Sequence, residues 1–232
     1  MSTAVSWQAL SYRWPGMSRP TVELADLALA QGESLFIQGP SGSGKSTLLN
    51  LLAGVLVPSE GQLQVLEQPL SDWSGRRRDR FRADHLGYIF QQFNLLPYLS
   101  VAANVELPAR LSKRRLQRTQ DEHGGLSAAV EHWLRRLQLP EALWHAPVSR
   151  LSVGQQQRVA AARALIGSPE LIIADEPTSA LDEDNVENFM QVLTEQCRSI
   201  KASLIFVSHD RRLGHWFDQH LALTAHAAEV SQ

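Results

Sequence analysis

The chain has 232 residues, 44% of them hydrophobic, and a formal net charge of −2 from 22 basic and 24 acidic side chains. This length predicts one large domain over residues 1–232, with enough apolar sequence to form a core, which excludes disorder as the overall state. The balance of charges excludes bulk attraction to nucleic acid or to an anionic membrane, so no nucleic-acid partner is expected.

The single cysteine, Cys197, can form neither an internal disulfide nor a thiolate metal site, which favours a reducing, cytoplasmic location. The chain opens on a polar stretch that lacks the cationic and apolar segments of a secretory signal. Its longest segment without Asp, Glu, Lys or Arg, residues 85–105, is too rich in amides to cross a bilayer. If the protein acts at a membrane, another polypeptide has to span it.

The predicted elements begin with period-two segments between residues 5 and 29, which indicate antiparallel strands. Four short apolar runs farther along are typical of strands buried on both faces of a parallel sheet. Helical patterns at 44–54 and 182–198 follow strands as in βαβ units, so we predict an α/β fold with a mostly parallel sheet. The four apolar runs are residues 34–38, 86–90, 171–174 and 203–207.

Residues 101–167 lie between the second and third of these runs and show helical patterns without a strand. A glycine pair at 124–125 interrupts the patterns, as such pairs commonly do between helices. We therefore predict an inserted α-helical lobe at about 92–167, within a core made of residues 1–91 and 168–232.

Residues 39–47 match the phosphate-binding pattern G-x-x-x-x-G-K-[ST] between a predicted strand and a predicted helix. The glycines let successive backbone N–H groups face one anion, Lys45 can reach the β- and γ-phosphates, and Ser46 offers its hydroxyl to Mg²⁺. A glycine-rich turn that binds nothing is disfavoured because Lys45 and Ser46 are both in register. The predicted nucleotide-binding residues here are Gly39, Pro40, Ser41, Gly42, Ser43, Gly44, Lys45, Ser46 and Thr47.

The apolar run at 171–174 is followed by two carboxylates, Asp175 and Glu176. They lie at the carboxyl edge of the predicted sheet, where doubly wound folds bind ligands. Asp175 suits a contact with magnesium, and Glu176 suits polarising the water that attacks a γ-phosphate. Together with the phosphate loop, the pair predicts nucleotide hydrolysis but leaves kinases, GTPases and helicases open.

Residues 151–160 read Leu-Ser-Val-Gly-Gln-Gln-Gln-Arg-Val-Ala. Ser152 is a good N-cap for the helix that follows, and its hydroxyl and the amides near Gly154 predict an anion site. The segment resembles the signature of the ATP-binding cassette (ABC) ATPases, which implies a P-loop NTPase core that binds and hydrolyses ATP. The motifs occur in the order of that family over most of the chain: residues 39–47, Gln91, 151–155, 171–176, 179–182 and His209.

In this family the signature of one subunit closes over the nucleotide held by the other. The resemblance therefore implies a dimer, taken as a homodimer, in which Ser152, Gly154 and Gln155 meet the partner's ATP. Val153 departs from the family, which commonly has glycine there. A β-branched residue resists positive φ and would weaken the closed state if closure needed that geometry, but tolerance is expected because Gly154 remains.

The resemblance assigns a role to Gln91, which would meet magnesium and the attacking water while it joins the lobe to the core. Gln92 is the weaker candidate for the same role. His209 resembles the switch histidine that hydrogen-bonds the γ-phosphate. The implied catalytic residues are Lys45, Gln91, Glu176 and His209, and the implied magnesium ligands are Ser46, Gln91 and Asp175.

Three further residues complete the implied site. Trp14 occupies the position where the family stacks an aromatic ring on adenine, with Tyr12 as the alternative and strand packing as the non-functional reading. Asp182 resembles the loop residue that crosses the dimer, and a helix N-cap is its other reading.

Residues 90–97 and 104–108 look most like the ATPase subunits of lipoprotein-release and macrolide-export systems. That resemblance implies a transmembrane permease subunit that inserts a helix into a groove over about 91–111, holding the chain at the cytoplasmic face of the membrane. The apolar residues 95–99 fit such a contact or the core of the lobe. The alternative function is a soluble ABC ATPase of the iron-sulfur assembly type.

Overall fold

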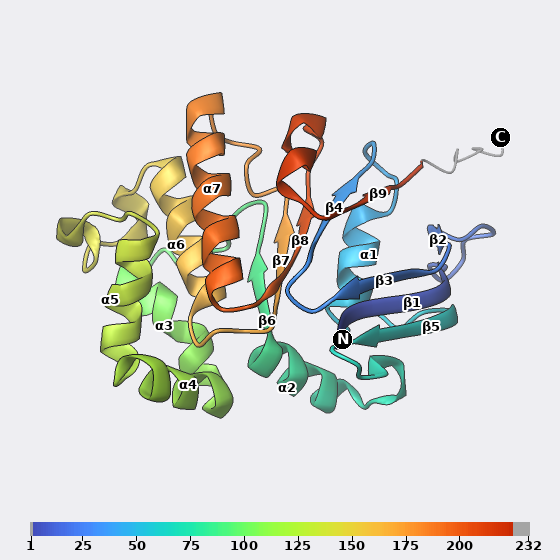
Figure 1. The fold of residues 1–232 in the computed structure, drawn as a ribbon, viewed down its shortest axis with the longest axis horizontal. Coiled ribbons are helices and arrows are strands. Elements are labelled where there is room, and N and C mark those ends of the chain that lie inside the picture. Colours follow the sequence, from blue (N-terminus) through green and yellow to red (C-terminus); the bar gives the residue numbers. More distant parts are fainter. Residues whose placement is uncertain (1, 225–232) are drawn as a thin grey trace.

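The computed structural model describes residues 2–224, so residues 1 and 225–232 of the predicted domain lie outside it. A parallel sheet forms from β4 (Ser34–Gln38), β6 (Leu86–Ile89), β7 (Leu171–Asp175), β8 (Ser203–Val207) and β9 (Gln219–Ala222). The strand order is β6-β7-β8-β4-β9, and all of these neighbours are parallel (Figure 1). The predicted strands thus form with ends within one residue of the prediction, whereas β9 was not predicted.

Successive residues of a strand face opposite sides of the sheet, so each strand contributes side chains to two hydrophobic clusters, one on each face. Ile173 joins the cluster that packs against α1 (Lys45–Leu52), and its neighbour Ile172 joins the cluster that packs against α6 (Val153–Leu165) and α7 (Glu183–Ser199). Because both faces are covered, the strands appear in the sequence as uninterrupted apolar runs.

A second, antiparallel sheet lies beside α1, as expected from the first thirty or so residues (Figure 1). Its long strand is β1 (Thr3–Tyr12), which pairs with β2 (Val22–Leu24), β3 (Leu27–Ala30) and β5 (Glu60–Val65). Strand β5 was not predicted.

Between residues 101 and 165 the long elements are helices, namely α3 (Val101–Leu111), α4 (Lys113–His123), α5 (Leu126–Arg136) and α6. Figure 1 shows them gathered on the side of the parallel sheet that lies away from the antiparallel strands. The predicted fold class, an α/β core with antiparallel N-terminal strands and inserted helices, is confirmed. The remaining elements are α2 (Gly75–His85), η1 (Leu70–Asp72), η2 (Glu141–Leu143), η3 (Val148–Arg150) and η4 (Arg211–Trp216).

Glu170, immediately before β7, ties the inserted helices to the core. Its carboxylate lies 2.6 Å from a guanidinium nitrogen of both Arg114 and Arg118 on α4, and 3.1 Å from Nδ1 of His85 at the end of α2. Burial raises the pKa of this carboxyl, but the hydrogen bonds from His85 and Arg114 and the charge of Arg118 outweigh burial and lower the pKa to about 2.

Glu170→Gln is expected to lower the free energy of unfolding by about 2 kcal/mol at neutral pH, less than the full shift implies because the carboxylate keeps some solvent contact. Since folding lowers this pKa, the stabilisation is present above the usual value of 4.5 and is lost as the pH falls toward about 2. Urea denaturation of both proteins should therefore show a difference that shrinks across this range. An equal difference at neutral pH and about pH 3 would contradict this account.

Candidate functional site

The phosphate loop, residues 39–47, connects β4 to α1. Gly42 and Gly44 have φ values of +79° and +89°, in the left-handed region that side chains disfavour. A Cβ added at Gly44 would lie 2.7 Å from the carbonyl oxygen of Thr21, so glycine is required there. The Nζ of Lys45 donates hydrogen bonds to the carbonyls of Gly39 (2.9 Å) and Pro40 (3.0 Å). The ammonium group thus lies against the loop, where it would contact an anion bound by the loop amides.

An unpaired hydroxyl lies in the same loop. Ser43 is buried, and its Oγ has no hydrogen-bond partner within the described residues. A buried unpaired hydroxyl is costly, and a bound phosphate would satisfy it. The loop therefore fits the triphosphate that its sequence predicts.

Trp14 and Tyr12, the two aromatic candidates for adenine, have different exposures. The indole Nε1 of Trp14 donates to Thr47 Oγ1 at 3.4 Å, and the side chain is 41% exposed. Tyr12 is 8% exposed and makes an edge contact with Trp14 at a ring-centroid distance of 5.2 Å. Trp14 is therefore the accessible aromatic residue beside the loop, whereas Tyr12 is buried and packs against the Trp14 ring.

The other predicted catalytic residues lie around the carboxylate of Glu176. Its Oε1 lies 2.6 Å from His209 Nε2 and 3.8 Å from Lys45 Nζ. Its Oε2 accepts a hydrogen bond from Gln91 Nε2 at 3.2 Å. These side chains follow β6, β7, β8 and β4, whose carboxyl ends share one edge of the sheet. The strand order therefore brings together residues that are up to 164 positions apart in the sequence.

Asp175 is the last residue of β7. Burial, and next the charge of Glu176, raise the pKa of its carboxyl, while the charge of Lys45 opposes them. Burial and the charge of Asp175 likewise raise the pKa of Tyr88 on the neighbouring strand. A desolvated carboxylate with excess negative charge nearby is stabilised by a cation, so Asp175 and the exposed Ser46 fit Mg²⁺.

The signature segment opens α6. Ser152 Oγ accepts a hydrogen bond from the backbone N–H of Gln155 at 3.3 Å, and Gln155 Oε1 accepts one from the N–H of Ser152 at 2.9 Å. The predicted N-cap is thus confirmed as a reciprocal capping box. Val153 is the first helical residue and has no positive φ. In this conformation a valine in place of the family's glycine therefore causes no backbone strain.

Asp182 lies next to the signature. It accepts a hydrogen bond from the N–H of Asn185 at 3.0 Å and caps α7, so its helix-capping role is confirmed. That bond is the main reason why the pKa of Asp182 is lowered. A hollow of about 440 Å³ lies between the two helix starts. Its lining includes Ser152, Val153, Gly154, Gln155, Arg158, Asp182 and Asn185.

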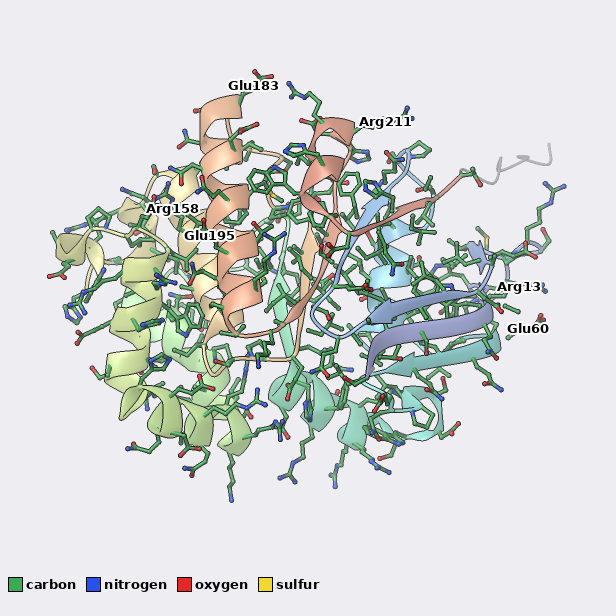
Figure 2. All side chains as sticks on the ribbon, viewed as in Figure 1. Arg13, Glu60, Arg158, Glu183, Glu195 and Arg211 are labelled. Carbon is green, nitrogen blue, oxygen red and sulfur yellow. The ribbon has the colours of Figure 1, made fainter. Side chains whose placement is uncertain are left out.

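The signature hollow is separate from the phosphate loop, because no residue of the loop lines it. In Figure 2, Arg158 of α6 and Arg13, which precedes Trp14, are labelled on opposite sides of the molecule. The phosphate loop with Lys45 and the signature hollow are thus two separate places on the chain, and none of the described residues that line the hollow is a lysine.

The sequence pattern of the ABC transporter family matches residues 22–179. The chain belongs to this family. It is 40% identical to the uncharacterized ABC transporter ATP-binding protein YbbA of Escherichia coli, over 85% of this chain and 83% of that protein. It is 37% identical to the lipoprotein-releasing system ATP-binding protein LolD of Hydrogenovibrio crunogenus, over 92% and 89% of the two chains.

The fold is also similar to a solved ABC cassette. MJ0796 in a dimeric post-hydrolysis state, bound to ADP and Pi, superposes with a TM-score of 0.83 at 31% identity, covering 96% of this chain and 97% of that one. With the family match and these relatives, this ABC protein is the ATP-binding and ATP-hydrolysing subunit of a transporter. The soluble iron-sulfur assembly alternative is not favoured.

Two side chains of this ABC ATPase that the sequence did not single out contact the loops around the site. Gln157 and Arg163 are buried on α6 and bond to backbone carbonyls beyond Glu176 and Gln91. The only sequence signal was their place within the helix that begins at the signature.

Proposed function

We propose that two copies of this chain enclose two ATP molecules and that their closure and separation drive a transmembrane permease. The observation that carries the proposal is the separation, within one chain, of the phosphate loop from the signature hollow. An anion site without its own lysine suits a phosphate presented by another subunit. Dimeric forms of the related cassette MJ0796 support the same arrangement.

In each site the phosphate loop would bind the triphosphate, Lys45 would leave its carbonyl partners for the β- and γ-phosphates, and Trp14 would stack on adenine. Glu176 would accept the proton of the attacking water, while Gln91 would orient that water and His209 would hold the γ-phosphate.

Mg²⁺ would be held by Ser46, Gln91 and Asp175, and when bound it neutralises charge on the phosphate oxygens. Ser152, Gly154 and Gln155 would complete the partner's site, and Asp182 would cross toward the partner's phosphate loop. Within the described residues, the capping bonds of Ser152 use the N–H of Gln155 but leave a lone pair on Oγ and the N–H groups of Val153 and Gly154 free for a phosphate.

The division into a core (1–91 and 168–232) and a helical lobe (92–167) is part of this proposal. It is supported by the absence of strands from the described elements between 101 and 167. A lobe that carries the signature could turn as a unit when two chains close.

A groove of about 530 Å³ between core and lobe is our candidate for the permease contact. Its walls are largely apolar, and Val55, Phe90 and Leu111 are exposed at 50%, 38% and 78%. Exposed apolar side chains around a groove favour an amphipathic helix as the partner. Of the segment 95–99, Leu96 lines the groove, whereas Leu95 packs on the lobe core, so both readings of this segment have support.

Within the described residues, no helix has both the length and the apolar character needed to cross a bilayer. Bound to a permease, the chain would lie at the cytoplasmic face of the membrane. The LolD relatives belong to lipoprotein-releasing systems, which supports a permease of the lipoprotein-releasing type as the partner.

Leu111→Asp is expected to lower recovery of the membrane-spanning permease that binds this chain by at least about tenfold, because a carboxylate in an apolar contact is costly. The measurement is co-purification from detergent-solubilised membranes. Leu116→Asp, at a 42% exposed leucine on α4 that does not line the groove, is the matched control and should recover the permease as the unmodified chain does. Equal recovery with Leu111→Asp would contradict the groove assignment.

A further inference from the structure

Helix α6 bonds to both loops that carry the pair Gln91 and Glu176. The pair is joined by one hydrogen bond of 3.2 Å between two side chains on separate loops, after β6 and after β7. Such a bond keeps its geometry only if both loops are held, because a surface loop is otherwise free to shift.

Arg163 holds the first loop. Arg163 is 9% exposed, and its guanidinium donates to the carbonyl of Asn94 at 2.7 Å and to the carbonyl of Phe93. Both acceptor residues have left-handed φ values, +57° at Phe93 and +47° at Asn94. Two consecutive non-glycine residues in this region form a strained reversal immediately after Gln91 and Gln92. Charge-assisted hydrogen bonds from Arg163 stabilise that reversal.

Gln157 holds the second loop. Its side chain is 1% exposed, and its Nε2 donates to the carbonyl of Pro177 at 2.9 Å. Pro177 follows Glu176, whose φ of +46° is also left-handed. The backbone N–H of Glu176 is fixed from the other side by the carbonyl of Val207 on β8. Glu176 is therefore held between the sheet and α6.

We infer that Arg163 and Gln157 are positioning residues of the hydrolytic site, which act through Gln91 and Glu176 and touch neither ATP nor water. The inference rests on the roles proposed above for that pair. Since α6 begins at Ser152, the helix that presents the signature also holds the chain's own catalytic pair.

The first test is a set of single variants of the full chain, assayed for ATP hydrolysis and for equilibrium ATP binding. Arg163→Met keeps the side chain's length and removes its donors, so kcat should fall about tenfold while the Kd for ATP stays within about twofold. Arg163→Lys keeps one donor and should recover about a third of the lost turnover. Gln157→Met should lower kcat about fivefold, again without a change in Kd.

The second test separates positioning from general destabilisation. If Arg163 acts through Gln91, then Arg163→Met introduced into Gln91→Ala should change kcat by less than about twofold, because no amide remains to be positioned. A further tenfold fall in the double variant, or unchanged kcat in Arg163→Met, would overturn the role of Arg163. Unchanged kcat in Gln157→Met would do the same for Gln157.

Arg118→Met is the matched control, because Arg118 also donates to a backbone carbonyl, that of Ser168, but lies on α4 and contacts neither loop. It should lower the unfolding temperature and keep kcat within about twofold; a tenfold fall in kcat would count against the inference. Gln91→Ala alone tests the proposed function itself. If that variant keeps full turnover, the role of Gln91 fails whatever Arg163 does.

Discussion

Glu176→Gln is expected to bind ATP with unchanged affinity and to lose turnover by about 10³-fold, because the neutral amide cannot accept the proton of the attacking water. The substitution keeps the size of the side chain and removes a negative charge next to Asp175 and Lys45. Hydrolysis would then no longer separate the closed dimer, so a dimer should accumulate in the presence of ATP. Steady-state ATPase assays and size-exclusion chromatography with and without ATP measure both effects.

Glu195→Gln is the matched control, because this exposed carboxylate on α7 bonds, within the described part of the chain, only to Gln191 and lies apart from the sheet edge. Its turnover and its elution volume should match those of the unmodified protein. Full hydrolysis by Glu176→Gln would refute the assigned role of Glu176. A variant that neither hydrolyses ATP nor dimerises would refute the resetting step.

Ser152→Arg has the second large expected effect. A guanidinium would fill part of the signature hollow and block the approach of the partner's nucleotide, so turnover should fall by at least about 100-fold. ATP binding to the monomer should persist, because the phosphate loop and Trp14 are untouched. Combined with Glu176→Gln, the substitution should abolish the ATP-dependent dimer on size-exclusion chromatography.

Ser152→Arg also removes the cap of α6, which is worth about 1 kcal/mol. Ser152→Asp separates the two effects, because aspartate is an equally good N-cap but repels a phosphate. It should keep the unfolding free energy and still lose the dimer. If Ser152→Asp dimerises and turns over normally, the signature hollow is not an anion site.

The sequence predicts most of the central sheet, for a reason that is visible in particular strands. Strands β4, β7 and β8 are covered on both faces, so the residues between their ends are all apolar and the runs stand out in the sequence. Strand β9 lies at the edge of the sheet and contains Gln219 and His220, and β5 is largely exposed. Neither strand has an unbroken apolar pattern, so each is recognised as a strand only from its pairing with a neighbouring strand in the structure.

The predictability of the site divides in the same way. Lys45, Asp175 and Glu176 follow from local motifs, since the backbone around each must place a charge at the end of a strand. The sequence could not rank Trp14 above Tyr12 on physical grounds, because their exposure depends on packing against α1 and the antiparallel sheet. The convergence of Gln91, His209 and Lys45 on one carboxylate likewise depends on strand order.

By itself, the sequence determined the chemistry: a loop for a triphosphate, a carboxylate pair, and a signature that begins with a helix cap. Each of these is local, because a few consecutive residues set the backbone that performs the task. Only the tertiary structure decided how the parts are held. The bonds from Arg163 to residues 93 and 94, and from Gln157 to Pro177, join positions up to 70 residues apart. These bonds form because α6 packs against the sheet, which brings its buried polar side chains to loop carbonyls that would otherwise be unpaired.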